Sequence, residues 1–233
     1  MNIAIIFAGG RGTRMGDVEV PKQFLEVAGK PIIILAIEAF QKNENIDKII
    51  VVTLSEWIEQ TWNFIRQYGL DKVEDVVEGG ETGQLSIFNG VKRALELYGR
   101  DNIILINDGV RPFISSDDIE KSIEVVKEVG ASAVAVQATE TVAKKEGDSI
   151  DKILNRDECV FLKAPQSFYL GEFYDCDSKA VSEGRVNFVD SASLMSYYGK
   201  KIGLVETSYD NIKITTKKDI IVAEAISKRI SHT

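Results

Sequence analysis

The sequence predicts an α/β protein built on a mostly parallel sheet with helices on both faces. Short β-branched runs alternate along the chain with longer segments of helical period, which is the pattern of parallel strands joined by helices. The 233 residues are 44% apolar, enough for one sizeable core. No repeat, low-complexity run or linker marks a boundary. We therefore expect residues 1–233 to form one domain.

The individual elements follow from this alternation. Strands are expected at 2–7, 48–53, 73–78, 102–108 and 131–137. Helical segments are expected between them, at 31–42, 55–68, 82–98 and 115–129. The second helical segment carries apolar side chains mostly at three- and four-residue spacings, which indicates core packing rather than a ligand site: Trp57, Ile58, Trp62, Phe64 and Ile65.

Capping boxes mark two helix starts. Ser115 with Asp118, and Thr216 with Asp219, have the spacing that satisfies the unpaired N–H groups of a first turn. Helices are therefore expected from about residues 116 and 217.

The stretch 139–165 breaks the alternation of strand and helix. It contains three short strand-like pieces, "TVAKKE", "SIDKIL" and "CVFLKA", with the turn "GDS" after the first. We expect a β-arm that protrudes from the sheet.

Charge and cysteine content exclude several classes of protein. The net charge of −8 argues against a nucleic-acid surface, which would be basic. Cys159 and Cys176 lack metal-type spacing and are too few for a disulfide framework. No segment approaches the length of a membrane span, and the chain opens directly on a strand-like run. The sequence thus favours a cytoplasmic protein that binds neither membranes nor nucleic acid.

A glycine-rich stretch, "FAGGRGTRMG", follows the first strand at 7–16. Glycines such as Gly10 and Gly12 let backbone N–H groups approach an anion closely, so a phosphate-binding loop is expected. The third glycine and the acidic ribose ligand of a dinucleotide site are missing, which disfavours an NAD-dependent oxidoreductase. The stretch does not match an ATPase P-loop either.

Positive charge accompanies these glycines. Arg11, Arg14 and, in "PKQFL", Lys22 could neutralise a triphosphate. The alternative is a solvated arginine-rich turn without a ligand.

Further candidates lie at the carboxyl ends of strands, where open α/β sheets bind ligands. Asp108 ends an apolar strand and suits Mg²⁺, although an aspartate in a turn paired with Arg111 would use the same residues. Within 78–90, glycines could receive a flat base, or the segment could be a plain strand, turn and helix. In "YDNIKITT", Lys213 could reach a phosphate.

Taken together, these motifs resemble the cytidylyltransferase family that contains the methylerythritol-phosphate and ribitol-phosphate cytidylyltransferases. The resemblance covers most of the chain and is carried, in the order of the family, by "AGGRGTRMG", "PKQFL", "EGG" followed by Ser86, "NDGVRPF", "APQSF" and "DNIKITT". It implies a GT-A-like, Rossmann-related domain. The implied reaction joins CTP to a polyol phosphate with Mg²⁺ and releases pyrophosphate.

The resemblance also implies roles for matching positions. Catalytic roles against the phosphates fall on Arg14, Lys22 and Lys213. Nucleotide binding falls on Ala8, Gly9, Gly10, Gly12, Gly79, Gly80, Ser86 and Asp108. Acceptor binding falls on Arg111, Thr141, Arg156 and Asp210, and metal binding on Asp108 and Asp210. Because the family's arm crosses to the neighbouring subunit, a homodimer with shared active sites is implied.

Acid–base catalysis by histidine is not expected. The one histidine, His232, lies in the polar tail, and a phosphate monoester is largely dianionic at neutral pH. It can attack the α-phosphorus without losing a proton, so positioning and electrostatic stabilisation suffice.

Four positions depart from the family pattern. Gly83 stands where an arginine is common, Asn107 replaces a histidine, Glu140 replaces an aspartate and Ala164 replaces a threonine. These changes put acceptor identity in question. The segments "PKQF", "VRPFI" and "NIKITT" look closer to the ribitol-phosphate branch, so ribitol 5-phosphate for cell-surface polymers such as a capsule is favoured. The alternatives are methylerythritol phosphate, for isoprenoid biosynthesis, and a non-catalytic nucleotide-binding homologue.

Overall fold

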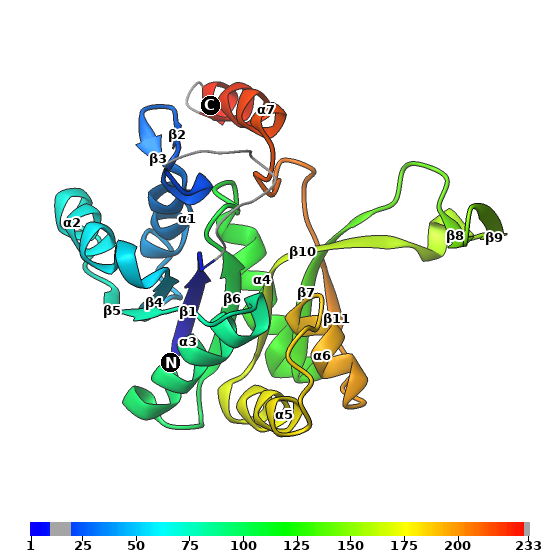
Figure 1. Cartoon of the computed structure of the whole chain (residues 1–233), viewed down its shortest axis with the longest axis horizontal. Helices are drawn as coiled ribbons and strands as arrows, with labels where there is room; N and C mark the ends of the chain where they lie inside the picture. The colour runs from blue at the N-terminus through cyan, green and yellow to red at the C-terminus, as the bar shows by residue number, and fades with distance from the viewer. Residues whose placement is uncertain (10–19, 231–233) are drawn as a thin grey trace.

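A seven-stranded sheet organises the computed structural model, which describes residues 1–9 and 20–230 (Figure 1). The strand order is β11-β7-β10-β6-β1-β4-β5. In chain order the strands are β1 (Asn2–Phe7), β4 (Lys48–Thr53), β5 (Val73–Glu78), β6 (Ile103–Asp108), β7 (Ala131–Gln137), β10 (Val160–Tyr169) and β11 (Gly203–Glu206). All neighbouring pairs are parallel except those of β10, which runs antiparallel to β6 and β7. The predicted mostly parallel α/β sheet is confirmed.

Helices cover both faces of this sheet, as predicted. The helices on one face are α1 (Ile32–Gln41), α2 (Ile58–Tyr68) and α4 (Ser116–Val129). Those on the other are α3 (Gly83–Tyr98), α5 (Leu170–Ser182) and α6 (Ser191–Tyr197). Alternate residues of β1 divide between two cores, because successive side chains of a strand point to opposite faces: Ala4 and Ile6 join the first, Ile3 and Ile5 the second.

A smaller apolar cluster attaches the C-terminal helix, α7 (Lys217–Ile230), to the rest of the molecule. Ala223 of α7 packs with Val27, Val110 and Ile214. Val27 belongs to a short hairpin of β2 (Glu26–Val27) and β3 (Lys30–Pro31).

Both predicted capping boxes are confirmed. The Asp118 N–H donates to Ser115 Oγ at 3.0 Å, and the Ser115 N–H donates to Asp118 Oδ2 at 3.2 Å. The Asp219 N–H donates to Thr216 Oγ1 at 3.4 Å, and the Thr216 N–H donates to Asp219 Oδ2 at 2.7 Å. Helices α4 and α7 begin directly after these caps.

The aromatic stripe at 57–65 packs on the core, as predicted. Trp57 stacks on Phe24 with ring centroids 4.3 Å apart. Phe24 ends a short 3-10 helix, η2 (Lys22–Phe24), so this stack fixes the segment that carries Lys22.

The protruding arm is a hairpin of β8 (Ala143–Glu146) and β9 (Ser149–Ile153), followed by the 3-10 helix η4 (Arg156–Glu158) (Figure 1). Both strands are exposed throughout. The last residues of the predicted arm, 160–165, belong instead to β10, which continues into the central sheet. Strand-like pieces of an arm and of a sheet share one sequence pattern, so the alternation did not separate them.

A search of the described residues found no helix with both the length and the apolar character needed to span a membrane.

Candidate active site

A cavity of about 650 Å³ opens at the carboxyl ends of β1, β4, β5 and β6. We call it the strand-end cavity. The carboxyl ends of parallel strands share one edge of a sheet, which is where ligands of open α/β folds bind. The described residues that were predicted to bind the nucleotide or its phosphates all line it: Ala8, Gly9, Lys22, Gly79, Gly80, Ser86, Asp108 and Lys213.

Three of these residues, Gly9, Gly79 and Gly80, lie so close to α3 that an added side chain would crowd it. A Cβ on Gly9 would lie 2.8 Å from Ser86 Oγ, and a Cβ on Gly79 would lie 3.0 Å from the same atom. At Gly80 a Cβ would lie 2.4 Å from the Leu85 Cβ. Glycine is therefore favoured at all three positions by close approach rather than by a positive φ, and most strongly at Gly80. The result is a wall of bare backbone beside the cavity.

The N-terminus of α3 completes this wall. Thr82 caps the helix by accepting from the Leu85 N–H at 3.1 Å. Ser86 Oγ accepts from the Gly80 N–H at 3.0 Å and donates to the Thr82 carbonyl at 2.9 Å. Since helix N-termini carry unpaired N–H groups and positive dipole ends, they favour an anionic ligand. Residues 78–86 therefore form a strand, turn and helix whose packing also suits a nucleotide.

Asp108 is buried and bound by two cations. Its Oδ2 accepts from Arg111 Nε at 2.8 Å, and its Oδ1 pairs with Lys213 Nζ at 2.5 Å. Burial alone would raise the pKa of Asp108, but Lys213 and Arg111 outweigh it and hold the pKa below its ordinary value. The ion pair with Arg111 that turn chemistry predicts is present, and Lys213 adds a second cation.

Asp210 lies elsewhere. Its carboxylate pairs with Arg229 of α7, and it lines a groove with Ser208 and Ser227 rather than the strand-end cavity. Asp210 lies in a turn at 209–210 and faces α7, while Lys213, in the irregular segment that follows, faces Asp108. The structure thus does not bring the two predicted metal carboxylates into one cavity. Within the described residues no three His, Cys, Asp or Glu side chains cluster as a metal site would require.

Other predicted site residues fall into two groups. Arg14, with Gly10 and Gly12, lies outside the described residues. Thr141 and Arg156 are exposed on the arm, where Arg156 Nη1 donates to the Thr139 carbonyl at 3.1 Å, and they line neither the strand-end cavity nor the one beside it.

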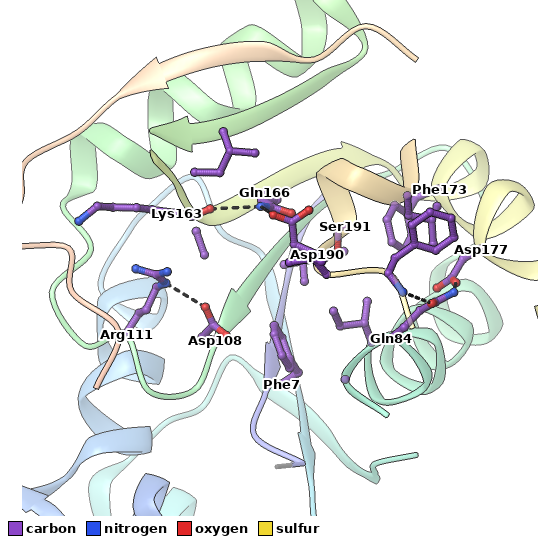
Figure 2. Close-up of a pocket in the computed structure, with 18 of the residues that line it drawn as sticks. Phe7, Gln84, Asp108, Arg111, Lys163, Gln166, Phe173, Asp177, Asp190 and Ser191 are labelled. Atoms are coloured by element: carbon purple, nitrogen blue, oxygen red, sulfur yellow. Dashed lines mark hydrogen bonds and ion pairs between the residues drawn. The ribbon is translucent and has the colours of Figure 1, made fainter. Parts of the chain in front are cut away.

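A second cavity, of about 310 Å³, adjoins the first and is shown in Figure 2. We call it the β10 cavity, because Lys163, Ala164 and Gln166 of β10 line it. The two cavities share four lining residues: Phe7, Gly83, Asp108 and Lys213. They therefore meet at the Asp108–Lys213 ion pair.

Several side chains in and around these cavities were not predicted. Gln23 is fully buried and donates to the Ala8 carbonyl at 2.7 Å, which fixes the end of β1. Lys163 Nζ donates to the Asn211 carbonyl at 2.9 Å, and burial, with a smaller effect of Arg111, lowers the pKa of Lys163. Lys163 and Gln166 lie on either side of Ala164 and Pro165 in the motif "APQSF". Their place in the cavity was not predicted, because the sequence did not indicate that β10 belongs to the central sheet. Asp177, on α5, belongs to no motif.

Comparisons with known proteins identify the family of this chain. The profile of the IspD family, 2-C-methyl-D-erythritol 4-phosphate cytidylyltransferase, matches residues 2–229. A ribitol-5-phosphate cytidylyltransferase of Streptococcus agalactiae serotype Ia is 44% identical over 97% of this chain and 95% of its own. A 2-C-methyl-D-erythritol 4-phosphate cytidylyltransferase of Clostridium kluyveri is 39% identical over 97% of this chain and 96% of its own.

Solved structures extend the likeness to the fold. The 4-diphosphocytidyl-2C-methyl-D-erythritol synthase of Anaerococcus prevotii superposes with a TM-score of 0.85 at 30% identity, over 98% of this chain and 96% of its own. The chain belongs to the 2-C-methyl-D-erythritol 4-phosphate cytidylyltransferase family of nucleotidyltransferases.

Proposed function

We propose that this protein transfers CMP from CTP to ribitol 5-phosphate, giving CDP-ribitol and pyrophosphate. The observation that carries the proposal is the pair of cavities that meet at Asp108 and Lys213. The strand-end cavity has the bare backbone wall that suits a nucleotide, and the β10 cavity opens beside the same lysine, Lys213. The choice of acceptor rests on the 44% identical relative named for ribitol 5-phosphate.

In this proposal the strand-end cavity holds CTP. Gly9, Gly79, Gly80 and Ser86 receive the cytidine, and Lys22 and Lys213, with Arg14, contact its phosphates. A phosphate oxygen of the acceptor forms a bond to the α-phosphorus while the bond from that phosphorus to the bridging oxygen of the β-phosphate breaks. Pyrophosphate leaves with the electron pair of that bond.

Charge stabilisation is the main task of the protein in this reaction. Negative charge builds up on the oxygens around the α-phosphorus and on the leaving pyrophosphate, so fixed cations lower the barrier. The ion pairs with Asp108 hold Arg111 and Lys213 in place before the substrates arrive. The acceptor phosphate needs no general base, because it is already dianionic.

Asp108 also fits a role in holding Mg²⁺. Magnesium is commonly bound by one or two carboxylates together with substrate phosphates, so one protein carboxylate beside the triphosphate is sufficient. When bound, the ion would neutralise part of the phosphate charge. Asp210 has no such position, since it faces Arg229 in a different groove.

We further propose that the arm acts between two subunits of a homodimer. An isolated two-stranded hairpin is marginal in water, and β8–β9 exposes Ile150 and Ile153. Packing against a second copy would bury these side chains and place Thr141 and Arg156 at the partner's acceptor. Since CTP and the phosphorylated acceptor are cytoplasmic metabolites, we place the reaction in the cytoplasm.

The assay that tests the function is pyrophosphate release with CTP and Mg²⁺. The acceptor panel contains ribitol 5-phosphate, 2-C-methyl-D-erythritol 4-phosphate, glycerol 3-phosphate and several sugar phosphates, with ATP, GTP and UTP as control nucleotides. We expect ribitol 5-phosphate to give the highest kcat/KM. Preference for methylerythritol phosphate would support the second candidate, which the 39% identical relative favours. CTP binding without turnover on any acceptor would indicate a non-catalytic homologue.

A further inference from the structure

Asn211 contacts two of the cations described above and stands two residues before the third, Lys213. It is 1% exposed and lines neither the strand-end cavity nor the β10 cavity. Its segment, between β11 and α7, is irregular, so no helix or strand sets the direction of its side chains. Individual contacts must therefore hold Lys213 against Asp108.

Asn211 and β10 exchange hydrogen bonds. Asn211 Nδ2 donates to the Ala164 carbonyl at 2.7 Å, and Lys163 Nζ donates to the Asn211 carbonyl at 2.9 Å. Both partners lie between Leu162 and Gln166, where the register of β10 against β7 shifts. In the described sheet, Ala164 faces no partner residue on β6 or β7. Since a buried carbonyl outside a strand ladder needs another donor, the Asn211 amide takes that place.

Arg111 ties the same carbonyl of Asn211 to Asp108. Its Nη1 donates to the Asn211 carbonyl at 3.0 Å, and its Nε donates to Asp108 Oδ2 at 2.8 Å (Figure 2). Asp108 Oδ1 in turn pairs with Lys213 Nζ at 2.5 Å. The backbone of Asn211 is thus linked through Arg111 and Asp108 to the ammonium of Lys213.

The other side of Lys213 is anchored by an apolar residue. Ile214 is 0% exposed in the cluster that attaches α7, and its N–H donates to the Val110 carbonyl at 2.9 Å. Lys213 therefore stands between an apolar anchor, Ile214, and a polar one, Asn211.

The cations at this place share few acceptors. Asp108 pairs with Arg111 and Lys213, whereas Lys163 donates to the carbonyl of Asn211. Burial, with a smaller effect of Arg111, lowers the pKa of Lys163. Because like charges repel, a displaced Asn211 carbonyl would allow the three cations to move apart.

Packing alone does not favour asparagine at position 211. Asn211 Oδ1 is buried and has no hydrogen-bond partner among the described residues. An unpaired buried acceptor destabilises a fold. The contribution of this amide is therefore its bond to Ala164, which holds the backbone beside the cations.

We propose that Asn211 is a positioning residue, whose side-chain amide ties residues 211–213 to β10 and thereby fixes the Lys213 ammonium where the two cavities meet. This inference rests on the proposed CMP transfer and adds how the fold sets the position of its lysine. Fixed cations stabilise a transition state best when they need not reorganise during the reaction. Loss of the amide should therefore slow the reaction through Lys213, because Asn211 itself borders neither cavity.

The test is a double-mutant cycle between Asn211 and Lys213. Asn211→Ala, Lys213→Met and the double variant are assayed for pyrophosphate release with CTP, Mg²⁺ and ribitol 5-phosphate. Asn102→Ala is the matched control, because Asn102 is 7% exposed and lines neither cavity. Its amide also donates to backbone carbonyls, those of Tyr98 at 2.9 Å and Gly99 at 3.1 Å.

Asn211→Ala should lower kcat/KM by about 10- to 100-fold, the range of a misplaced catalytic group, and Asn102→Ala by less than about threefold. In the Lys213→Met background, Asn211→Ala should cost less than about threefold, because residues that act through one another are not additive. Equal losses in both backgrounds would overturn the proposal. So would full activity of Asn211→Ala, or an equal loss in Asn102→Ala.

Urea denaturation of each variant shows whether it folds. If Asn211→Ala does not fold, Asn211→Ser takes its place in the cycle, since serine keeps a hydroxyl donor of shorter reach. The loss should then be smaller and should again disappear in the Lys213→Met background. A loss that persists there would count against the proposal in the same way.

A binding measurement separates this inference from the proposed function. Calorimetry of CTP with Mg²⁺, without an acceptor, repeats the cycle and needs no turnover. Asn211→Ala should weaken CTP binding by about tenfold when Lys213 is present, the size of a hydrogen bond to a charged group, and not when it is methionine. If no acceptor releases pyrophosphate but binding shows this dependence, the transfer is wrong and the positioning role stands. If pyrophosphate is released and the two losses simply add, the positioning role is wrong and the transfer stands.

Discussion

Lys213 and Asp108 form an ion pair, with Lys213 Nζ 2.5 Å from Asp108 Oδ1, at the place where the two cavities meet. The Asp108 side chain is 9% exposed and the Lys213 side chain 39% exposed. The carboxylate is thus enclosed, whereas the lysine side chain is partly exposed and lines both cavities. Asp108 therefore positions a cation that remains able to contact a phosphate.

Replacing this lysine should slow the reaction strongly. Lys213→Met removes the positive charge and keeps a similar length, and we expect kcat/KM to fall by about 10²- to 10³-fold, as for other lost transition-state contacts. Lys121→Met is the matched control, because Lys121 pairs with Asp117 on α4 and lines neither cavity. Steady-state rates of pyrophosphate release measure both. Turnover of Lys213→Met within threefold of the wild type would contradict the assigned role.

Arg14 gives a prediction from sequence alone, because it lies outside the described residues. Arg14→Ala should lower turnover by about 10²- to 10³-fold if its guanidinium stabilises the phosphates in the transition state. The measurement is kcat with saturating CTP. Near-normal turnover would remove Arg14 from that role and support the solvated-turn alternative.

The close packing of Gly9 on Ser86 can be tested by stability. Gly9→Ala places a Cβ 2.8 Å from Ser86 Oγ, so we expect about 1–3 kcal/mol of destabilisation from overpacking. Ser86→Ala removes that oxygen, so the double variant should be more stable than the sum of the two single losses implies. Chemical denaturation of the wild type, the two single variants and the double variant gives the coupling free energy between the two positions. Strict additivity would mean that the two residues do not press on each other.

Opposite pKa shifts at two buried carboxyl groups predict opposite pH effects on stability. The pKa of Asp177 rises from 3.8 to about 6 on folding, so the folded chain binds its proton more tightly than the unfolded chain. The contribution of the protonated Asp177 carboxyl to the free energy of unfolding is therefore full below about pH 4. It is lost as the pH rises through 6. The free energy of unfolding of the wild type relative to Asp177→Asn should therefore fall by about 3 kcal/mol across that range.

Asp108 should behave in the reverse sense, because its pKa is lowered on folding. The stability of the wild type relative to Asp108→Asn should be greatest above the ordinary aspartate pKa and should decline as the pH falls. Urea denaturation at a series of pH values measures both differences. If the free-energy difference from the wild type changed with pH in the same direction for Asp177→Asn and for Asp108→Asn, the environments assigned to the two carboxyl groups would be wrong.

The fold and much of the site could be predicted because their signals are local. A β-branched run such as 2–7, a capping box such as Ser115 with Asp118, and glycines next to a strand each carry their meaning within a few residues. The antiparallel course of β10 could not be predicted, since it depends on which strands lie beside it. Because Asp177 is placed next to Gln84 only by the packing of α5 on α3, its burial has no sequence signal.

Asp210 shows the other limit of sequence reasoning. It sits three residues before Lys213, and proximity in the chain together with the family resemblance suggested a shared site. Asp210 stands in a turn and Lys213 in the irregular segment after it, so no regular periodicity fixes the directions of the two side chains. Asp210 forms an ion pair with Arg229 of the last helix, on a different surface from Lys213 and Asp108. A motif therefore located the segment correctly but not every side chain in it.

The proposed exchange of arms between subunits predicts complementation of inactive variants. Lys213→Met damages a subunit's own cavity, and Arg156→Ala damages the arm that reaches its partner. In a mixed dimer, one active site combines an intact Lys213 with an intact Arg156 from the neighbour. Co-expression of the two variants should therefore restore up to about a quarter of wild-type activity, because half of the dimers are mixed and each has one intact site.

The outcome separates action within a subunit from action between subunits. If Arg156 served the cavity of its own chain, every site would keep one defect and co-expression would restore nothing. Sedimentation at micromolar concentration supplies the companion measurement, since a monomer could not complement at all. The exposed position of Arg156 on an arm that lines neither cavity makes restored activity the expected result.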